Sequence, residues 1–199
     1  MPDYTYEISA KNNGYSVICG VDEAGRGPLA GPVCAASVIL PEGEVIEGLN
    51  DSKKLSEKKR EALFDVVKQK AIAWSVAFAS VEEIEEHNIL NATFIAMNRA
   101  IEGLGVKPDF ALIDGNRIPK DIKIPCETIV KGDSLSMSIA AASILAKVTR
   151  DRLMLELDEK YPLYEFKKHK GYGTALHMDL IRKYGPSECH RPSFLKKIK

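Results

Sequence analysis

Short apolar runs alternate along this chain with stretches in which apolar residues recur every three or four positions. The short runs predict five strands, at residues 17–21, 33–40, 71–80, 110–113 and 128–130. The helical recurrence, bounded by N-cap candidates and glycines, predicts helices at 56–70, 81–87, 89–104, 134–160 and 174–184. Residues 1–13 are expected to form a leader with an early strand or loop, and residues 161–173 a further loop.

The order of these elements predicts an α/β fold with a five-stranded mixed sheet flanked by helices. The first two strands are separated by a short segment containing Gly31 and Pro32, so they are expected to pair as an antiparallel hairpin. The later strands alternate with helices, which is typical of a layered α/β protein. Internal repeats and linker-like tracts are not apparent, and 199 residues suit one domain. Residues from about 161 to 199 are predicted to form a helical C-terminal extension of it.

Composition fits a folded cytoplasmic protein. Hydrophobic residues make up 45% of the chain, enough for a sizeable core. No apolar run approaches the roughly 20 residues that cross a bilayer, and the first residues do not resemble a signal peptide. The four cysteines are isolated and show no metal-binding spacing, which favours reduced thiols over a zinc site.

Charge is distributed unevenly, although the formal net charge is zero. The stretch from residue 166 to 199 holds nine Lys or Arg residues against two acids, Asp179 and Glu188. A basic C-terminal quarter suits a polyanionic partner such as nucleic acid. A solvated helix face would have a similar composition, so the charge pattern leaves both interpretations open.

Four carboxylates follow predicted strands: Asp22, Glu23, Asp114 and Asp133. Acids that leave a sheet at the same edge are expected to lie close together, where they repel and require cations. Hard oxygen ligands select Mg²⁺ or Mn²⁺, and two such ions can support phosphodiester hydrolysis. Neighbouring residues on a strand point to opposite faces, so Asp22 and Glu23 can share a site only if the strand ends or distorts there.

Each candidate also has a purely structural interpretation. Asp133 could cap the following helix, and Asp114 with Gly115 could form an ordinary turn. Tyr172 could be a core aromatic residue, although glycines flank it in a polar segment. The histidines at 169, 177 and 190 could act in acid–base chemistry, but histidines beside lysines are more often surface residues. Ser143, Lys147 and Arg150 share a helical face and could line the site or simply pack.

Several motifs together resemble a known family. The run from Asp22 to Pro32, Asp-Glu-Ala-Gly-Arg-Gly-Pro-Leu-Ala-Gly-Pro, looks like the opening motif of bacterial ribonuclease HII. The resemblance continues, in the same order, at residues 51–56, 114–116, 131–133, 141–147, 169–173 and 190–194. The sister type, ribonuclease HIII, usually has Gly-Lys-Gly where this chain has Gly25-Arg26-Gly27, and carries an extra N-terminal domain.

The resemblance implies a ribonuclease-H-like fold, with which the order of predicted strands is compatible. It also implies an endonuclease that hydrolyses the RNA strand of RNA–DNA hybrids and cuts 5′ of ribonucleotides embedded in duplex DNA, leaving 3′-OH and 5′-phosphate ends. Two Mn²⁺ or Mg²⁺ ions would be held by Asp22, Glu23, Asp114 and Asp133. The enzyme is expected to be a cytoplasmic monomer that takes part in ribonucleotide excision repair.

The same resemblance assigns roles to the substrate-binding residues. Gly25, Arg26 and Gly27 would contact the ribose 2′-hydroxyl at the RNA–DNA junction, and glycine permits the close approach that this contact needs. Tyr172 would stack on the following sugar, as a platform that ignores base sequence. Ser52 and Lys53 would hold a backbone phosphate.

Two other functions compete with this one. A non-catalytic protein that binds RNA–DNA hybrids could keep the groove, but the four intact carboxylates argue against it. Another two-metal nuclease of the same fold, such as a transposase-type enzyme, could keep the carboxylates, but the Gly25-Arg26-Gly27 segment and Tyr172 argue against that function. Incubation with a duplex that carries one ribonucleotide, with metal or chelator, would discriminate between them.

Overall fold

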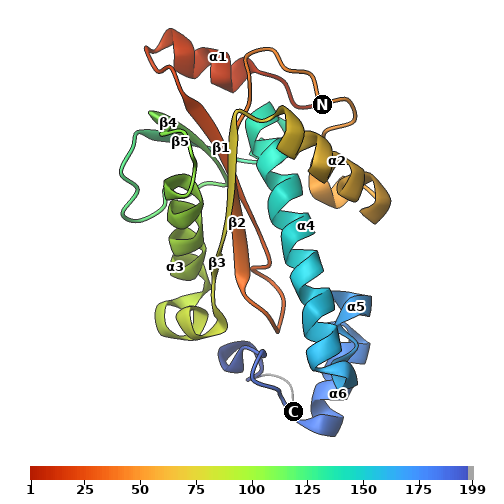
Figure 1. The fold of residues 1–199 in the computed structure, drawn as a ribbon. Helices are drawn as coiled ribbons and strands as arrows, with labels where there is room; N and C mark the ends of the chain where they lie inside the picture. The colour runs from red at the N-terminus through yellow and green to blue at the C-terminus, as the bar shows by residue number, and fades with distance from the viewer. Residues whose placement is uncertain (197–199) are drawn as a thin grey trace.

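The computed structural model describes residues 1–196, and Figure 1 shows their arrangement as one sheet with helices on both faces. The strands are β1 (Ile18–Ala24), β2 (Val33–Ile39), β3 (Ala73–Ala79), β4 (Phe110–Asp114) and β5 (Cys126–Ile129). The α-helices are α1 (Thr5–Asn12), α2 (Glu57–Lys70), α3 (Val81–Glu102), α4 (Met137–Lys160), α5 (Phe166–His169) and α6 (Ala175–Tyr184). The 3₁₀ turns are η1 (Ser52–Lys54), η2 (Gly132–Ser134), η3 (Pro162–Tyr164) and η4 (Pro192–Phe194). Residues 197–199, which carry two lysines of the predicted basic extension, lie outside the described residues.

The five strands form a mixed sheet in the order β3-β2-β1-β4-β5. β1 pairs antiparallel with β2, and β2 pairs antiparallel with β3. β4 pairs parallel with β1 on its other side, and β5 pairs parallel with β4. The predicted mixed sheet and the predicted hairpin of the first two strands are therefore confirmed, and β1 lies at the centre with a neighbour of each kind.

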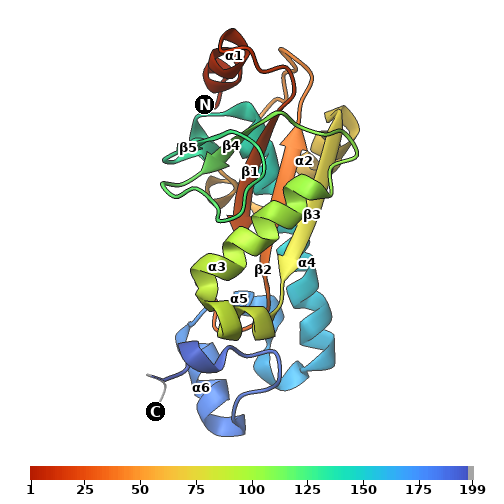
Figure 2. The same cartoon turned by 90° about the vertical axis from the view of Figure 1, so that its left-hand side faces the viewer.

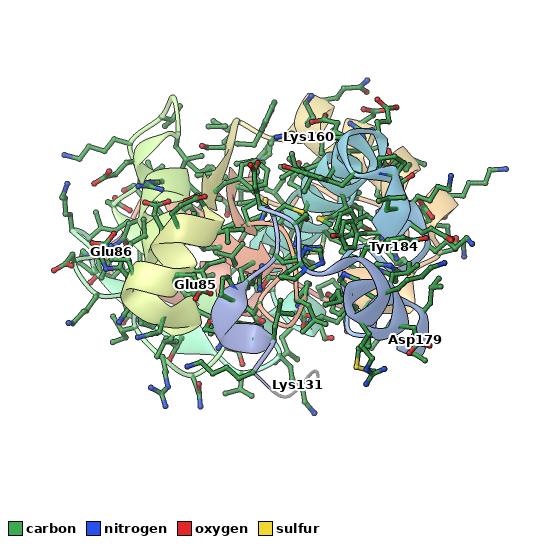
Figure 3. The ribbon with its side chains drawn as sticks, turned by 90° about the horizontal axis from the view of Figure 1, so that it is seen from below. Glu85, Glu86, Lys131, Lys160, Asp179 and Tyr184 are labelled. Atoms are coloured by element: carbon green, nitrogen blue, oxygen red, sulfur yellow. The ribbon has the colours of Figure 1, made fainter. Side chains whose placement is uncertain are left out.

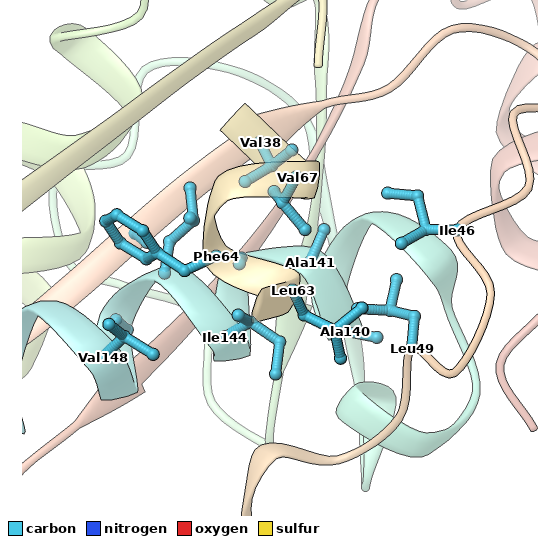
Figure 4. Packing of buried hydrophobic residues seen from close by; sticks show 14 of the residues in the cluster. Val38, Ile46, Leu49, Leu63, Phe64, Val67, Ala140, Ala141, Ile144 and Val148 are labelled. Atoms are coloured by element: carbon cyan, nitrogen blue, oxygen red, sulfur yellow. The ribbon is translucent and has the colours of Figure 1, made fainter. Parts of the chain in front are cut away.

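Helices cover both faces of the sheet. Figures 1 and 2 show α4 along one face, α2 outside α4, and α3 across the opposite face. Figure 4 shows the hydrophobic cluster on the α4 side of the sheet, in which Leu63, Phe64 and Val67 of α2 meet apolar residues of α4. Burial of these large side chains stabilises each helix by about 1.5–3 kcal/mol per residue. No helix within residues 1–196 is long and apolar enough to cross a membrane.

The central strand packs directly against the backbone of α4 at Gly20, which has no side chain. A Cβ atom added at Gly20 would lie 2.2 Å from the main-chain carbon of Ser138, near the start of α4. A larger residue would therefore push the helix away from the strand. This contact fixes the distance between β1, which carries Asp22, and the helix that covers it.

The N-terminal segment differs from its prediction, because residues 5–12 form helix α1 and not a strand or loop. Tertiary contacts explain the difference. The buried carboxylate of Glu7 accepts hydrogen bonds at 2.6 Å from the hydroxyls of Ser136 and Ser138. Ala10 packs in a small cluster that includes Ile18 of β1.

The predicted loop at 161–173 also differs, since it contains η3 and α5. Phe166 is fully buried there and packs with Met154 of α4, which turns this segment into a folded part of the core. By contrast, the predicted pair of helices at 81–87 and 89–104 is confirmed in its essential feature. Helix α3 is interrupted at Asn88, whose φ of 63° and ψ of 163° are not helical.

Two boundaries near the predicted site differ as well. β1 extends to Ala24, so Asp22 and Glu23 lie within the strand and not beyond its end. The long helix begins at Met137, after the separate turn η2 that contains Asp133. Both differences bear on the carboxylate site.

Replacing Gly20 with Ala is expected to lower the free energy of unfolding by about 1–3 kcal/mol, the usual cost of overpacking. For a chain of this length, each kcal/mol corresponds to roughly 2–4 °C in Tm. Thermal unfolding of Gly20→Ala and of Gly105→Ala measures the effect, since a Cβ at Gly105 would meet nothing within 4 Å. Equal Tm values for the two variants would contradict the close packing of α4 on β1.

Candidate active site

Three aspartates gather at one end of the sheet. Asp22 comes from β1, Asp114 ends the neighbouring β4, and Asp133 lies in η2 just after β5. One carboxylate oxygen of each lies within 4.8 Å of the others. Asp22 and Asp133 are buried, and Asp114 is partly buried. The parallel pairing of β1, β4 and β5 produces this convergence, because parallel strands end at the same edge of the sheet.

The structure decides between the alternative interpretations of two of these residues. Asp133 does not cap the long helix, because Ser136 is the N-cap and its hydroxyl accepts from the Ile139 amide. Asp114 does more than end a turn, because its Oδ1 accepts a hydrogen bond of 2.7 Å from the Gly132 amide, across to η2. This bond fixes the distance between β4 and the turn that carries Asp133.

Glu23, the fourth predicted carboxylate, is not one of the three converging residues. Since β1 continues past it, Glu23 and Asp22 point to opposite faces of the strand. Its Oε1 lies 3.3 Å from Nη1 of Arg26, in an ion pair. It remains near the cluster, because its charge contributes to raising the pKa of Asp22.

Burial and mutual repulsion together disfavour ionisation of Asp22 and Asp133 when no metal is bound. Burial raises the pKa of Asp22 well above its ordinary value, and the charges of Glu23 and Asp114 raise it further. Burial likewise raises the pKa of Asp133, with Asp114 and Asp51 adding to the effect. The folded state therefore disfavours the fully ionised cluster unless a cation lies among the carboxylates.

One cation of the protein already reaches the cluster. Nζ of Lys53 lies 3.7 Å from Oδ2 of Asp133, and its side chain is 73% exposed. Partial burial acts to lower the pKa of Lys53, but the carboxylates of Asp22 and Asp133 outweigh it and the net shift is upward. A set of hard carboxylate oxygens, crowded and short of positive charge, fits a divalent metal ion of the Mg²⁺ or Mn²⁺ type.

Ser52 and Ser143 connect this cluster to the loop before α2. The Ser143 hydroxyl donates to the Ser52 hydroxyl at 2.9 Å, and the nearby Ser143 side chain also acts to lower the pKa of Asp22. Both serines are buried. Asp51, next to Ser52, was assigned no role from the sequence, yet its charge acts on Asp133. Its place in the motif at residues 51–56 was the signal available in the sequence.

The Gly25–Gly27 segment and Tyr172 come together from distant parts of the chain. A Cβ at Gly27 would lie 3.8 Å from Cε1 of Tyr172, so the ring borders this segment. The Tyr172 ring is 42% exposed, which excludes the core-aromatic interpretation. Gly25 has a φ of +93°, a conformation that favours glycine.

The three histidines are buried, which excludes the surface interpretation that the sequence left open. His169 and His177 stack with ring centroids 4.2 Å apart, and Nε2 of His177 lies 3.1 Å from Nε2 of His190. Burial lowers the pKa of both His177 and His190 to about 4. His169 accepts from the Gly171 amide and His177 bonds to the carbonyl of Tyr172, so this stack positions the backbone around the exposed ring.

The sequence left open whether Ser143, Lys147 and Arg150 of α4 line the site or simply pack, and the three residues differ in this respect. Ser143 lies at the carboxylates, as described above, whereas Arg150 is fully buried and bonds to main-chain carbonyls. Lys147 is intermediate: it pairs with Asp151 at 2.7 Å and its Nζ lies 5.7 Å from the centre of the Tyr172 ring.

The mixed sheet and the aspartate cluster at its edge define a class of protein. They are the arrangement of an α/β enzyme that uses divalent metal ions in phosphate-ester chemistry.

Comparison with known proteins defines the family within that class. The family model described as Ribonuclease HII matches residues 19–197. The ribonuclease HII of Caldicellulosiruptor bescii is 56% identical over 195 residues, which cover 97% of this chain and 94% of that protein. The ribonuclease HII of Idiomarina loihiensis is 59% identical over 178 residues, covering 89% and 95%. A crystal structure of ribonuclease H2 from Pyrococcus horikoshii OT3 has a TM-score of 0.77 at 28% identity, covering 92% of this chain and 97% of that one.

The chain therefore belongs to the ribonuclease HII family. It is a metal-dependent endoribonuclease that acts on RNA–DNA hybrids. The resemblance drawn from the sequence motifs and the predicted ribonuclease-H-like fold are both confirmed.

Asp133→Asn should leave the metal-free protein as stable as the wild type, or more stable, near neutral pH. The folded state raises the pKa of Asp22 and Asp133 above 3.8, so it binds protons more tightly than the unfolded state. Stability without metal therefore falls as the pH rises above that value, and removing one carboxylate removes part of the loss.

Thermal unfolding with and without Mn²⁺ is the measurement. Mn²⁺ at about 100 times its dissociation constant should stabilise the wild type by about 2.7 kcal/mol, and Asp133→Asn by much less. The control is Asp65→Asn, which changes an exposed aspartate of α2. An equal Mn²⁺ effect in Asp133→Asn would show that Asp133 is not a metal ligand.

Proposed function

We propose that this enzyme cuts a duplex on the 5′ side of a ribonucleotide, recognising the ribose 2′-hydroxyl through Gly25, Arg26 and Gly27. The observation that carries the proposal is the position of these three residues directly after β1. The strand that holds Asp22 leads within three residues into a glycine-containing segment bordered by the exposed Tyr172 ring. Carboxylates and recognition segment are thereby joined by one short piece of backbone.

The roles of the individual residues follow from what each one can offer. Gly27 is exposed and allows the backbone to approach a sugar, whereas Gly25 is buried and supplies the positive φ of the turn. A 2′-hydroxyl is the local feature that distinguishes RNA from DNA. Tyr172 offers a ring face for stacking on the next sugar. Lys53 offers an exposed ammonium group to a backbone phosphate. The Ser52 hydroxyl is buried against Ser143, so it would reach a phosphate only by exchanging that partner.

The carboxylates would hold two divalent ions, Mn²⁺ or Mg²⁺. Asp22, Asp114 and Asp133 would supply the converging oxygens, and Glu23 would join them by leaving its ion pair with Arg26. When bound, such ions lower the pKa of a water molecule and stabilise the oxygen that leaves phosphorus. The Gly132 amide holds Asp114 in place before the ions arrive.

We also propose that residues 1–199 act as a single catalytic domain with residues from about 161 as its basic C-terminal extension, and that the enzyme works as a cytoplasmic monomer. The extension packs on α4 through Phe166 and Met154, which supports one continuous unit. A hybrid-binding protein without activity is disfavoured by the clustered aspartates, whose charges would serve no purpose in binding a polyanion.

A DNA duplex with one ribonucleotide should be cut 5′ of that ribonucleotide, leaving a 3′-hydroxyl and a 5′-phosphate. Water is the nucleophile in this scheme and the 2′-hydroxyl serves recognition. The same duplex with deoxyribose at that position should resist cleavage, because the segment from Gly25 to Gly27 then meets no hydroxyl. Mass spectrometry of the fragments, with Mn²⁺, Mg²⁺ or chelator, identifies the ends. A 2′,3′-cyclic phosphate, or cleavage that persists in chelator, would contradict the proposed roles of the carboxylates.

Tyr172→Ala should reduce cleavage at a single embedded ribonucleotide more than it reduces binding to plain duplex DNA. Stacking on an aromatic ring contributes about 1–3 kcal/mol, and here it would orient the site of cleavage. Because the ring is 42% exposed, Tm should change little. Tyr172→Phe is the matched control and should keep most of the activity. Unchanged cleavage with a lower Tm would instead assign the ring a packing role.

A further inference from the structure

Two fully buried arginines lie beneath the segment that follows β1. Arg150, of α4, and Arg191, just before η4, are both 0% exposed. Within residues 1–196 neither has a carboxylate oxygen within the 4.0 Å of an ion pair. Buried charges of this kind are normally paired, so their partners require an explanation.

The guanidinium group of Arg191 donates hydrogen bonds to the main chain between Gly25 and Gly31. Its Nη2 donates to the Gly25 carbonyl at 2.7 Å, and its Nη1 donates to the carbonyls of Arg26 and Pro28 at 3.0 and 2.8 Å. Its Nε donates to the Gly31 carbonyl at 2.8 Å. Four carbonyls of one short loop are thus turned toward a single guanidinium group.

Arg150 supports the same loop through other main-chain carbonyls. It donates to the carbonyls of Ala30 and Pro32, at 3.1 and 3.3 Å, and to that of Lys170, two residues before Tyr172, at 2.9 Å. Its side chain also fills the space at Gly25, where a Cβ would lie 1.9 Å from its Nε. The loop and the backbone near Tyr172 therefore share a support.

The carbonyl directions determine where the amides point. All peptide bonds of the described chain are trans, and a planar trans peptide holds its N–H opposite to its C=O. Since the carbonyls of Gly25 and Arg26 face Arg191, the amides of Arg26 and Gly27 face away from it. Neither amide donates to another protein group among residues 1–196. They are free donors at the surface bordered by Tyr172.

We infer that Arg191 is a positioning residue for substrate recognition, which holds the amides of Arg26 and Gly27 in the direction that a ribose hydroxyl requires. This inference rests on the proposed recognition of the 2′-hydroxyl by Gly25, Arg26 and Gly27. Arg191 touches no substrate in this role. Its guanidinium group sets the orientation of the peptide groups that contact the ribose.

The C-terminal segment carries Arg191 into place. It crosses beneath the loop from α6 to α3, and Figure 3 shows the turn after Arg191 lying beside Glu85. Glu85 accepts from the amide and the hydroxyl of Ser193, at 3.0 and 2.7 Å. The Ala30–His190 bridge and the bond from the Arg191 amide to the Leu29 carbonyl complete the attachment. The carboxylate cluster has no part in these contacts.

The test measures discrimination between ribose and deoxyribose. Binding of a duplex with one ribonucleotide and of the matching all-DNA duplex is measured with Mn²⁺ in an Asp133→Asn background, which prevents cleavage. Arg191→Lys keeps the positive charge but loses the planar fork of donors. The ratio of the two dissociation constants should fall by about tenfold, as for one well-made hydrogen bond. Binding of the all-DNA duplex should stay near that of the parent.

Arg99→Lys is the matched control. Arg99 also donates to a main-chain carbonyl, that of Phe78 at 2.9 Å, but it lies on α3 away from the loop. The Arg99→Lys variant should leave the ratio of the two dissociation constants unchanged. A lower Tm with an unchanged ratio in Arg191→Lys would overturn the inference and leave Arg191 a purely structural role.

Two further results separate the inference from the function on which it rests. If the parent protein itself does not distinguish the two duplexes, the proposed recognition of ribose fails. If the parent distinguishes them and Arg191→Lys does so equally well, only the role of Arg191 fails. Should Arg191→Lys not fold, Glu85→Gln replaces it, since Glu85 is exposed and loosens the same segment through Ser193. A ratio about two- to threefold lower is then expected, and an unchanged ratio overturns the inference.

Discussion

Repulsion among carboxylates that the fold forces together is the constraint on which the site depends. Asp22, Asp114 and Asp133 bring oxygens within 4.8 Å of one another in a largely buried position, and the pKa shifts of Asp22 and Asp133 are both upward. A free chain would separate these groups. The sheet prevents it, because two of the three residues lie on adjacent parallel strands and the third is tied to β4 through the Gly132 amide. The folded chain therefore holds the repelling carboxylates in an arrangement that favours the binding of cations.

Helix α4 carries this constraint into the rest of the molecule. Its first turns contact β1 at Gly20, which leaves no room for a side chain between helix and strand. Ser143 and Arg150 lie seven residues apart, which is two helical turns and hence one face. Ser143 lies near Asp22 and acts to lower the pKa of that carboxyl, and Arg150 supports the loop after β1. One rigid element therefore sets the relative positions of the carboxylates and the loop at residues 25–32.

What could be predicted from the sequence was determined locally. The apolar runs before Asp22 and Asp114 indicated strands, and the strands placed the acids at one edge of a mixed sheet. Features that depend on distant partners were missed. Helix α1 is stabilised by a bond between residues 129 positions apart, Ser136 and Glu7, and Arg191 reaches the Gly25 carbonyl across 166 positions. The pairing of Glu23 with Arg26 was likewise unforeseen, because it depended on how far β1 continued.

The loop after β1 and the carboxylate cluster are stabilised in different ways, and this difference determines which of them is complete without metal. The loop at residues 25–32 is held by hydrogen bonds from Arg150 and Arg191 to its neutral main-chain carbonyls, and these contacts are complete within the protein. The carboxylates are held against their own repulsion, and their charge is balanced only when cations are bound. The loop is therefore formed before any metal arrives, whereas the carboxylate cluster is completed by the metal. Under the proposed roles, recognition of the sugar and hydrolysis of the phosphodiester are separable events, with selectivity built into the polypeptide and reactivity conferred by the ion.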